Sequence, residues 1–354
     1  MSRPLFLLRS AAVLALAVAT GTVAQASPYS AIYAFGDSLS DAGNLFLLSS
    51  NPANGIPHQP LPPYSAGRFT NGNTWVQDLS LLLGNGPLTA SLAGGNDYAY
   101  GGARTGTTAV GAATFIDLPS QLGQFGFTHA TVPSSALYTL SIGANDIFGA
   151  LGQVAGGALT VAQAQAAIAV AAQNAADFAF VLQALGARQL VLYDVPNIGA
   201  TPAYKGLGPL AALATALSFT FNADVQNDLA LAEAAGLKVD TLGEFARLNA
   251  VIADPAAFGF SNVTDPCWTG GFQGPTAGAT LCSTTAAGQD TYLFWDGVHP
   301  TEAGHFLVAQ DALRAVPEPP TMMLLLTGLV GIGLLRHGAT SQRLSGVKIV
   351  KNSG

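Results

Sequence analysis

Short apolar runs alternate with longer helix-like segments along the middle of the chain, between residues 27 and 315. Most of these runs end at a glycine or an aspartate, where a strand would meet a turn. They lie at 31–35, 97–100, 137–142, 189–193 and, as a weaker fifth, 238–240. Because they are apolar nearly throughout rather than at alternate positions, they predict a parallel sheet that helices cover on both faces.

The segments between these runs carry signals for helices. Residues 160–185 are rich in alanine, Thr160 and Gln163 form a capping-box pattern, and Gly186 stands where a helix would stop. A second helix is predicted over about 210–235, where another glycine follows. Alternating strands and helices of this kind are typical of an α/β fold.

Polar residues collect at the ends of the predicted strands. They are Asp37, Ser38, Gly101, Gly102, Asn145, Asp146, Asp194 and Asn197. Any one of them alone is ordinary turn chemistry. Parallel strands bring their carboxyl ends to one edge of the sheet, however, and ligands bind outside that edge. The sequence therefore predicts a functional site there.

The N-terminal residues 1–26 have the layout of a secretory signal peptide. Arg3 and Arg9 precede an apolar run at 11–19, and Ala24-Gln25-Ala26 supplies small residues for cleavage. We therefore expect export through the inner membrane and removal of this segment. The alternative is a permanent membrane anchor, although the apolar run is shorter than the roughly 20 residues that span a bilayer with ease.

The C-terminal residues 316–354 contain a second apolar segment. Pro317-Glu318-Pro319 precedes the uncharged residues 321–335, and Arg336 follows them. This order resembles the PEP-CTERM sorting signal of bacteria, which implies an exosortase-type sorting machinery as a partner and a place at the cell surface, in the outer envelope or outside the cell. The 18 residues after Arg336 depart from that pattern. A plain membrane tail is the alternative.

Composition and charge narrow the classes of partner. The chain is 49% hydrophobic and 9% charged, and its mean hydropathy is +0.38, with the apolar excess at the two ends. Residues 27–315 hold 7 Lys and Arg against 19 Asp and Glu, a net charge of −12. Such a surface repels phosphate backbones, so nucleic acid is not an expected partner. Within this part, residues 51–73 are rich in Pro and Gly and predict a long surface loop.

No cofactor or metal ion is expected for this chain. Its 2 cysteines are too few for a disulfide scaffold or for the common structural zinc sites. The sequence contains no phosphate-binding loop pattern and no cluster of histidine, cysteine and acidic residues that would indicate a metal site. About 290 residues between the two ends can bury a sizeable core as a single domain.

Four sequence blocks resemble those of the GDSL, or SGNH, hydrolase family. They are Phe35-Gly36-Asp37-Ser38-Leu39, Tyr98-Ala99-Tyr100-Gly101-Gly102, Gly143-Ala144-Asn145-Asp146 and Asp296-Gly297-Val298-His299-Pro300, in the order of the family. The resemblance implies a three-layer α/β/α sandwich with a flavodoxin-like parallel sheet over residues 27–315. It also implies hydrolysis of carboxylic esters by an esterase or lipase.

The same blocks supply the groups that acyl transfer needs. Ser38 would be the nucleophile, His299 the base that activates it, and Asp296 the group that orients the imidazole. A spacing of three residues lets Asp296 reach His299 from the same turn. The other histidines of this part of the chain are His58, His129 and His305. His305 is predicted to have a surface or structural role, on a helix that begins near Thr301.

The negative charge that develops on the substrate oxygen needs hydrogen-bond donors that are already in place. We expect three: the backbone N–H of Ser38, the backbone N–H of Gly102 and the side-chain amide of Asn145. Gly101 remains an alternative to Gly102, one residue earlier. Either glycine could also serve only to permit a tight turn.

Cys267 and Cys282 are the only cysteines of the chain, and they flank a stretch with four Gly and no charge. Export places the protein in an oxidising compartment, where such a pair usually forms a disulfide. Two buried free thiols are the alternative. Because the stretch ends 14 residues before Asp296, we expect the bridge to steady the turn that carries Asp296 and His299.

Three classes of function are compatible with this sequence. The first is an exported serine esterase or lipase that acts on a lipid, an acylated sugar or an aryl ester through an acyl-enzyme on Ser38. The second is an acyltransferase that uses the same residues to pass the acyl group to an alcohol. The third is a surface or matrix-binding protein on the hydrolase fold that no longer turns over, and the retained Ser38, Asp296 and His299 argue against it.

Overall fold

Four parallel strands form the centre of the molecule. The computed structural model describes residues 27–316, apart from 107–113, 115 and 130, so the predicted signal peptide and the predicted sorting segment beyond Val316 lie outside the described residues. The strands are β1 (Ile32–Gly36), β2 (Leu137–Ser141), β3 (Gln189–Tyr193) and β4 (Lys238–Leu242), hydrogen-bonded in the order β1-β2-β3-β4. These four strands confirm four of the five predicted runs.

The register of the sheet brings the carboxyl ends of the strands to one edge. Gly36 pairs with Ser141, Ser141 pairs with Tyr193, and Tyr193 pairs with Leu242. The polar residues that follow the strands therefore start from one level of the fold, as the sequence predicts. This edge carries the candidate site described below.

The prediction of a regular strand at 97–100 is wrong. This segment does lie beside β1, since Tyr98 N donates to Ala34 O at 2.7 Å and Tyr100 N donates to Gly36 O at 3.1 Å. It forms only an isolated bridge with β1, because the next backbone donor of β1, Gly36 N, donates to the side-chain Oε1 of Gln121 at 2.9 Å instead of to a carbonyl of this segment. Residues 97–100 come second along the chain, after β1 and before β2. When the five segments are numbered by their order in the sequence, they lie side by side in the order 2-1-3-4-5, which is the flavodoxin-like order.

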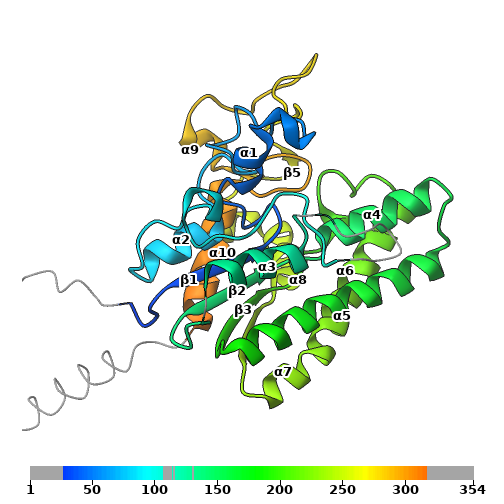
Figure 1. Ribbon diagram of the computed structural model, residues 1–354. Coiled ribbons are helices and arrows are strands. Elements are labelled where there is room, and N and C mark those ends of the chain that lie inside the picture. Colours follow the sequence, from blue (N-terminus) through cyan, green and yellow to red (C-terminus); the bar gives the residue numbers. More distant parts are fainter. Residues whose placement is uncertain (1–26, 107–113, 115, 130, 317–354) are drawn as a thin grey trace, which may run out of the picture.

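Helices cover both faces of the sheet, which makes the predicted three-layer α/β/α sandwich (Figure 1). One face packs against α3 (Leu118–Thr128), α4 (Ala144–Ala155), α5 (Val161–Leu185) and α6 (Pro209–Asp228). The other face packs against α2 (Trp75–Leu82) and α10 (Glu302–Ala315). Along β1, Tyr33 and Phe35 point into the first layer while Ile32 and Ala34 point into the second. Burial on both sides explains why the strands read as continuous apolar runs.

The alanine-rich helix forms where the sequence predicts it. Thr160 and Gln163 make the capping box at the start of α5, and Gly186 follows its last residue. Within the described part of the chain, α5 is the one helix that is long and apolar enough to cross a membrane by length and composition. Its Ala164, Ala171 and Ala179 are fully buried against the sheet layer, so this composition is that of a helix packed in the core.

The second predicted helix is divided into two. The structure has α6 up to Asp228 and α7 (Ala230–Ala234), with a break at Leu229. The backbone of Leu229 keeps nearly helical angles, with φ −65° and ψ −17°, and Glu233 N still donates to Leu229 O at 3.0 Å. The predicted run is therefore correct in extent and differs only by this irregularity.

A smaller lobe stands above the carboxyl edge of the main sheet, where Figure 1 shows α1, α9 and β5 together. It contains α1 (Asn44–Ser49), the parallel pair β5 (Asn262–Pro266) and β6 (Tyr292–Phe294), and α9 (Ala286–Gln289). The predicted loop 51–73 also belongs here, and its one regular element is the short helix η1 (Pro52–Asn54). The remaining elements are α8 (Glu244–Ala253), η2 (Ser91–Ala93), η3 (Ile198–Ala200) and η4 (Pro255–Phe258).

The two ends of the described chain lie close together, on the side of the sheet opposite the lobe (Figure 1). Tyr29, just before β1, and Val316, just after α10, pack against the same buried cluster. The helix α10 begins beside the lobe and runs back along the sheet over 14 residues, about 21 Å. The chain therefore enters and leaves this part of the molecule at the amino edge of the strands.

Candidate active site

Ser38 stands on a tight turn directly after β1. Gly36 ends the strand with φ 136°, and a Cβ there would lie 1.9 Å from the carbonyl oxygen of Ser141, so only glycine fits. Asp37 then shapes the turn, because its carboxylate accepts a hydrogen bond from Leu39 N at 3.1 Å and its carbonyl accepts one from Ser40 N. The turn presents the Ser38 hydroxyl at the carboxyl edge of the sheet.

His299 and Asp296 stand on a second turn, between β6 and α10. Oδ1 of Asp296 accepts hydrogen bonds from Val298 N at 2.9 Å and from His299 N at 2.8 Å, and Trp295 N donates to His299 O. These bonds close the turn on itself. They hold the imidazole over the carboxylate, as the three-residue spacing predicts.

The structure brings the three predicted residues into one hydrogen-bonded chain. Nδ1 of His299 lies 2.8 Å from Oδ2 of Asp296, and Nε2 lies 2.8 Å from Oγ of Ser38. All three residues are buried, with exposed fractions of 5% for Asp296, 6% for His299 and 9% for Ser38. Ser38 and His299 are 261 positions apart in the sequence. The fold thus places a carboxylate, an imidazole and a hydroxyl in a row.

Asp296 is held in its charged form by its neighbours. Burial acts to raise the pKa of its carboxyl group, but the charge of His299 and the hydrogen bonds from the imidazole and from two backbone N–H groups outweigh it. The net effect lowers the pKa of Asp296 below its ordinary value. A carboxylate that stays ionised beside the imidazole can orient the ring and stabilise its protonated form.

Tyr64 is a fourth member of this network that the sequence did not reveal. Its hydroxyl donates to Oδ2 of Asp296 at 2.7 Å, and its ring is 3% exposed. Burial and the charge of Asp296 raise the pKa of Tyr64 well above its ordinary value, so the hydroxyl remains a donor. Tyr64 comes from the proline-rich loop, 232 residues before its partner. No local pattern connects the two.

The other histidines of the described chain are engaged elsewhere. His305 is buried on α10, where its Nδ1 lies 3.3 Å from the backbone N–H of Trp75 at the start of α2. Burial, with the nearby His299, lowers the pKa of His305 to about 3, which keeps the ring neutral as an acceptor. His58 contacts Ser49, and His129 contacts Thr128 and Tyr98. The predicted structural role of His305 fits these contacts.

The geometry distinguishes between the two glycines considered for the oxyanion site. The backbone N–H of Gly101 donates to Oδ2 of Asp41 at 2.7 Å, so it is already committed. Gly102 has a φ of 81°, and its backbone N–H has no hydrogen-bond partner among the described residues; the same holds for that of Ser38. Gly102 is therefore the glycine that remains open to a ligand.

Asn145 lies beside Gly102. It belongs to the first turn of α4, and its Nδ2 donates to the carbonyl oxygen of Ala103 at 2.9 Å, one residue after Gly102. This bond uses one of the two amide hydrogens. The other has no hydrogen-bond partner among the described residues, which leaves it available to a bound oxygen. The predicted donors Ser38, Gly102 and Asn145 are thus compatible with a single oxyanion site.

Several acids at this edge serve to tie loops together. The carboxylate of Asp41 accepts hydrogen bonds from the backbone N–H groups of Gly43, Asn44, Leu45 and Gly101, which joins the first block to the glycine block. Asp146 binds the backbone and hydroxyl of Thr105. Burial raises the pKa of Asp41 and of Asp146 to about 6. Asp41 and Asp146 thus hold together loops that are distant in the sequence.

Asp194 and Asn197, at the end of β3, lie at the same edge but bind other loops. The carboxylate of Asp194 accepts from the backbone N–H groups of Glu244 and Phe245 at the start of α8. Asn197 exchanges hydrogen bonds with Asn249 and Thr215. The strand-end pattern therefore overestimated the number of residues in the site.

Comparisons with known proteins show the family to which the chain belongs. A family model described as GDSL-like Lipase/Acylhydrolase matches residues 32–312. The chain belongs to this family. Esterase EstA of Pseudomonas aeruginosa is 32% identical over 360 residues, which cover 89% of this chain and 51% of that protein. A GDSL esterase/lipase of Arabidopsis thaliana, At4g16230, is 26% identical and is covered over 86% of its length.

This GDSL family chain spans about half the length of the two Pseudomonas esterases that it matches. Among solved structures, the acetylxylan esterase Axe2 from Geobacillus stearothermophilus superposes with a TM-score of 0.40 at 15% identity, over 82% of this chain and 94% of that one. An extracellular lipase from Streptomyces rimosus gives a TM-score of 0.40 at 20% identity, over 81% and 99%.

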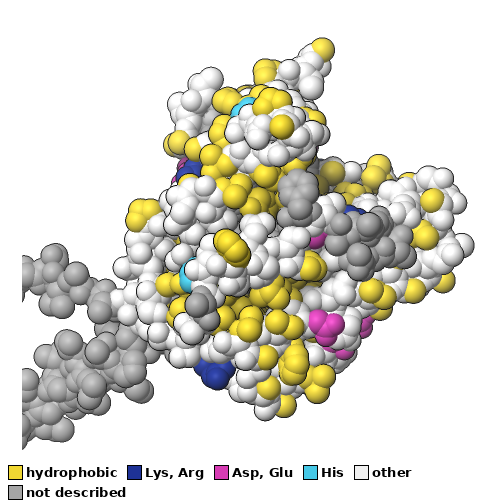
Figure 2. Space-filling view, viewed as in Figure 1, with side chains coloured by type: hydrophobic (Ala, Val, Ile, Leu, Met, Phe, Trp, Pro, Cys, Tyr) yellow, Lys and Arg dark blue, Asp and Glu magenta, His cyan; other side chains and the backbone are white. Residues whose placement is uncertain are grey.

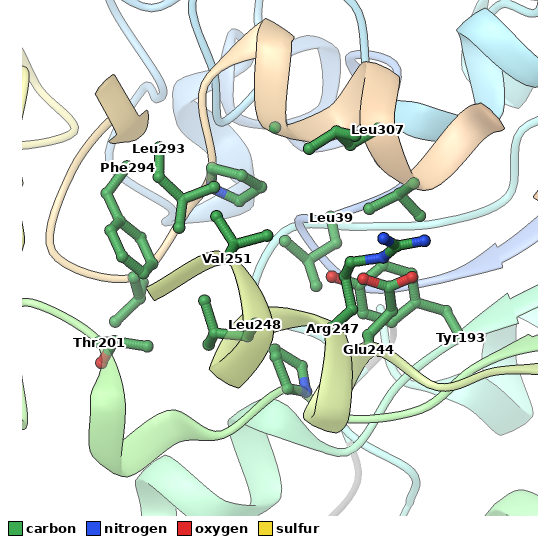
Figure 3. A pocket seen from close by; sticks show the side chains of 15 residues that line it. Leu39, Tyr193, Thr201, Glu244, Arg247, Leu248, Val251, Leu293, Phe294 and Leu307 are labelled. Carbon is green, nitrogen blue, oxygen red and sulfur yellow. The ribbon is translucent and has the colours of Figure 1, made fainter. Parts of the chain in front are cut away.

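A separate cavity of about 60 Å³ lies between α8, α10 and β6 (Figure 3). Leu39 and Val298, the neighbours of Ser38 and His299, form part of its wall, but Ser38 and His299 themselves do not line it. Most of its lining is aliphatic, with Glu244, Arg247 and Tyr193 at one end (Figure 3). The cavity thus adjoins the two turns that carry Ser38 and His299 in this GDSL family chain, and neither residue lines it.

Glu244 in this cavity is expected to make the stability of the protein depend on pH. Burial, with the charges of Asp311 and Asp194, raises its pKa from 4.5 to about 8. Between these values the folded state binds a proton that the unfolded state releases, so stability falls as pH rises from about 4.5 to 8. Glu244→Gln cannot ionise. It should therefore be more stable than the wild type at pH 8, by on the order of 2 kcal/mol, with little difference at pH 4.5.

Thermal unfolding of both proteins at the two pH values measures this effect. Glu233→Gln on the exposed face of α7 serves as the matched control and should behave like the wild type at both. A stability difference between Glu244→Gln and the wild type that is the same at pH 4.5 and pH 8 would contradict the prediction.

Cys267 and Cys282 form the expected disulfide. Their Cα atoms are 4.6 Å apart, and the bridge closes the base of an irregular hairpin in which Thr269 N donates to Thr280 O and Cys282 N donates to Cys267 O. Trp268, next to the bridge, packs with Tyr64 and Trp295. The hairpin is therefore joined through buried side chains to the turn that carries Asp296.

Loss of this disulfide is expected to lower stability and to weaken activity without abolishing it. Closing a loop with a sequence separation of 15 contributes about 3 kcal/mol in the chain-entropy model. Cys267→Ser, Cys282→Ser and the double variant should therefore unfold at the same reduced temperature, as should the reduced wild type. Thermal unfolding with and without reductant, together with an ester assay, checks this. Equal unfolding temperatures for oxidised and reduced wild type would contradict it.

Proposed function

We propose that this protein is an exported serine hydrolase that cleaves carboxylic esters through an acyl-enzyme on Ser38. The observation that carries the proposal is the buried chain from Asp296 through His299 to Ser38, with 2.8 Å at each of the two contacts of the imidazole. A serine hydroxyl is a weak nucleophile on its own and is activated by a base that a carboxylate orients. Membership of the GDSL-like family supports the same reaction.

The proposed reaction follows from these positions. The Ser38 Oγ attacks the ester carbonyl carbon while His299 Nε2 takes its proton, and Asp296 stabilises the imidazolium. The resulting oxyanion is bound by the N–H groups of Ser38 and Gly102 and by the amide of Asn145. His299 then donates its proton to the departing alcohol oxygen, which leaves an ester on Ser38. Water attacks this ester with His299 again as the base, and releases the acid and the free serine.

We also propose that residues 27–315 are the catalytic domain and that residues 1–26 direct its export. Three observations support this: the signal-peptide layout, the Cys267–Cys282 disulfide, which fits an oxidising compartment, and the family match over 32–312. Residues 316–354 would direct sorting at the cell surface, in the outer envelope or outside the cell, with the exosortase-type machinery as partner. Blocking of processing by substitution of Pro317-Glu318-Pro319 would test this last point.

A serine-directed phosphonate tests the proposed function directly. It should label Ser38 in the wild type and stop ester hydrolysis in proportion to labelling. Product analysis with an added alcohol then separates hydrolysis from acyl transfer, because a transferase would form the new ester in preference to the free acid. Labelling of no serine would indicate a protein that binds without turnover.

Asn145→Ala is expected to reduce kcat about 100- to 1,000-fold, because one donor to the developing oxyanion is lost. The effect should fall on kcat more than on KM, since the charge that Asn145 meets exists mainly in the transition state. Steady-state kinetics with a soluble ester measure it. Asn197→Ala, at the same sheet edge but bound to Asn249 and Thr215, is the matched control and should stay within a few-fold of the wild type. An equal loss of kcat in both variants would show that Asn145 is not an oxyanion donor.

A further inference from the structure

We propose that Phe272, at the tip of the disulfide-closed hairpin, forms an apolar subsite for the alcohol portion of the ester and favours esters of aryl or longer alkyl alcohols. This inference rests on the proposed ester hydrolysis and names its substrate class. It starts from the aromatic side chains that surround the catalytic base.

Two phenyl rings flank the imidazole of His299. The ring of Phe69 lies at a centroid distance of 5.2 Å with an interplanar angle of 35°, and the ring of Phe272 lies at 5.9 Å with an angle of 66°. Phe69 and Phe272 also contact one another edge to face at 5.3 Å. Tyr64 lies against both of them, at 6.3 Å from Phe69 and 5.8 Å from Phe272.

Phe272 alone among these rings is open to solvent. The exposed fraction is 3% for Tyr64 and 4% for Phe69, but it is 37% for Phe272. Phe69 fills the interior, since its ring would be 2.2 Å from a Cβ placed on Gly101. A ligand that enters beside His299 therefore meets Phe272, the exposed ring, rather than the buried Phe69 or Tyr64.

The hairpin holds Phe272 in place. The carbonyl oxygen of Phe272 accepts a hydrogen bond from Leu61 N at 2.7 Å, and Gly271 and Gly274 exchange backbone hydrogen bonds across the tip. The side chain of Gln273 donates to Gln59 at 2.9 Å. With the disulfide at its base, the hairpin is fixed at both ends. Its aromatic tip is therefore positioned before a substrate arrives, which lowers the entropic cost of binding.

The chemistry assigns Phe272 to the alcohol side of the substrate. His299 Nε2 must protonate the departing alcohol oxygen, so the group carried by that oxygen has to lie beside the imidazole. The carbonyl oxygen of the ester lies instead at the proposed oxyanion site, beside Gly102 and Asn145. The stretch between the two cysteines contains no charged residue, and Figure 2 shows mostly uncharged side chains, many of them apolar, over the lobe. An apolar alcohol fits these surroundings.

Two substrate series test this assignment. The alcohol series is ethyl, hexyl and phenyl acetate, and the acyl series is ethyl acetate, butanoate and hexanoate. In Phe272→Ala, kcat/KM for hexyl and phenyl acetate relative to ethyl acetate should fall about tenfold, because these groups lose an apolar contact in the acylation step. Ratios within the acyl series should change less than twofold. Phe272→Leu, which keeps an apolar side chain, should retain the preference for the hexyl ester over the ethyl ester.

The control is Phe127→Ala on α3, whose ring is 93% exposed and belongs to no part of the site. It should leave all ratios as in the wild type. Alcohol-series ratios within twofold of the wild type in Phe272→Ala overturn the subsite, as does a change confined to the acyl series. If the wild type hydrolyses no ester of either series, the proposed function fails as well, which is a different result from ester hydrolysis without selectivity.

Discussion

Replacement of Ser38 with alanine is expected to lower kcat for ester hydrolysis by about 10⁴-fold or more, since among the described residues Ser38 has the one hydroxyl that is hydrogen-bonded to His299. The fold should remain intact, because the one hydrogen bond that the Ser38 hydroxyl makes within the described chain is to His299. Steady-state kinetics with a chromogenic ester, together with circular dichroism, measure both expectations.

Ser40→Ala is the matched control for this variant. Ser40 lies two residues along the same turn, is fully buried, and accepts a hydrogen bond from Nε1 of Trp75 at 3.1 Å. Its loss should reduce stability by about 1 kcal/mol and leave most of the activity. A Ser38→Ala variant that retained more than a small fraction of wild-type activity would remove Ser38 as the nucleophile.

His299→Gln is expected to cause a loss of activity as large as that of Ser38→Ala, and the double variant should be no worse than either. The reason is that the two residues act as one unit, so that removing either stops the same step. Gln can keep the polar contacts of the turn but cannot accept the serine proton. Kinetics of the two single variants and the double variant measure this.

His305→Gln tests whether the base is His299 or the nearby His305. His305 accepts the backbone N–H of Trp75 and is neutral, so its replacement should cost about 1–3 kcal/mol of stability while the remaining folded protein stays active. Thermal unfolding and an ester assay at a temperature where both variants are folded give the comparison. Activity in His299→Gln with none in His305→Gln would move the base to His305.

Contiguous motifs made the centre of the site predictable. Ser38 follows a buried strand, and Asp296 and His299 share one turn, so the local sequence determines both pieces and the sheet brings them together. The strands of the sheet could be predicted equally well, because burial on both faces makes each of them apolar nearly throughout. The exception was 97–100, an edge segment whose pairing with β1 stops because Gln121, 85 residues from Gly36, takes the Gly36 N–H, a contact that no run of residues encodes.

The residues that surround the base could not be predicted in this way. Tyr64, Phe69 and Phe272 come from a proline-rich loop and from a glycine-rich hairpin, where no periodicity marks which side chains are buried. Their contacts cross large sequence separations, 232 residues for Tyr64 and Asp296. The disulfide was predictable only as a pair of cysteines. The contact between Phe272 of this hairpin and His299 arises only in the tertiary structure.

The two ends of the described chain lie at the edge of the sheet opposite Ser38. Tyr29 and Val316 lie together at the amino edge of the strands, whereas Ser38 lies at the carboxyl edge. A tether that continued from either end would hold the molecule at the amino edge of the strands, with Ser38 on the side away from the supporting surface. Such a protein would meet esters that arrive from the medium more readily than those in the layer beneath it.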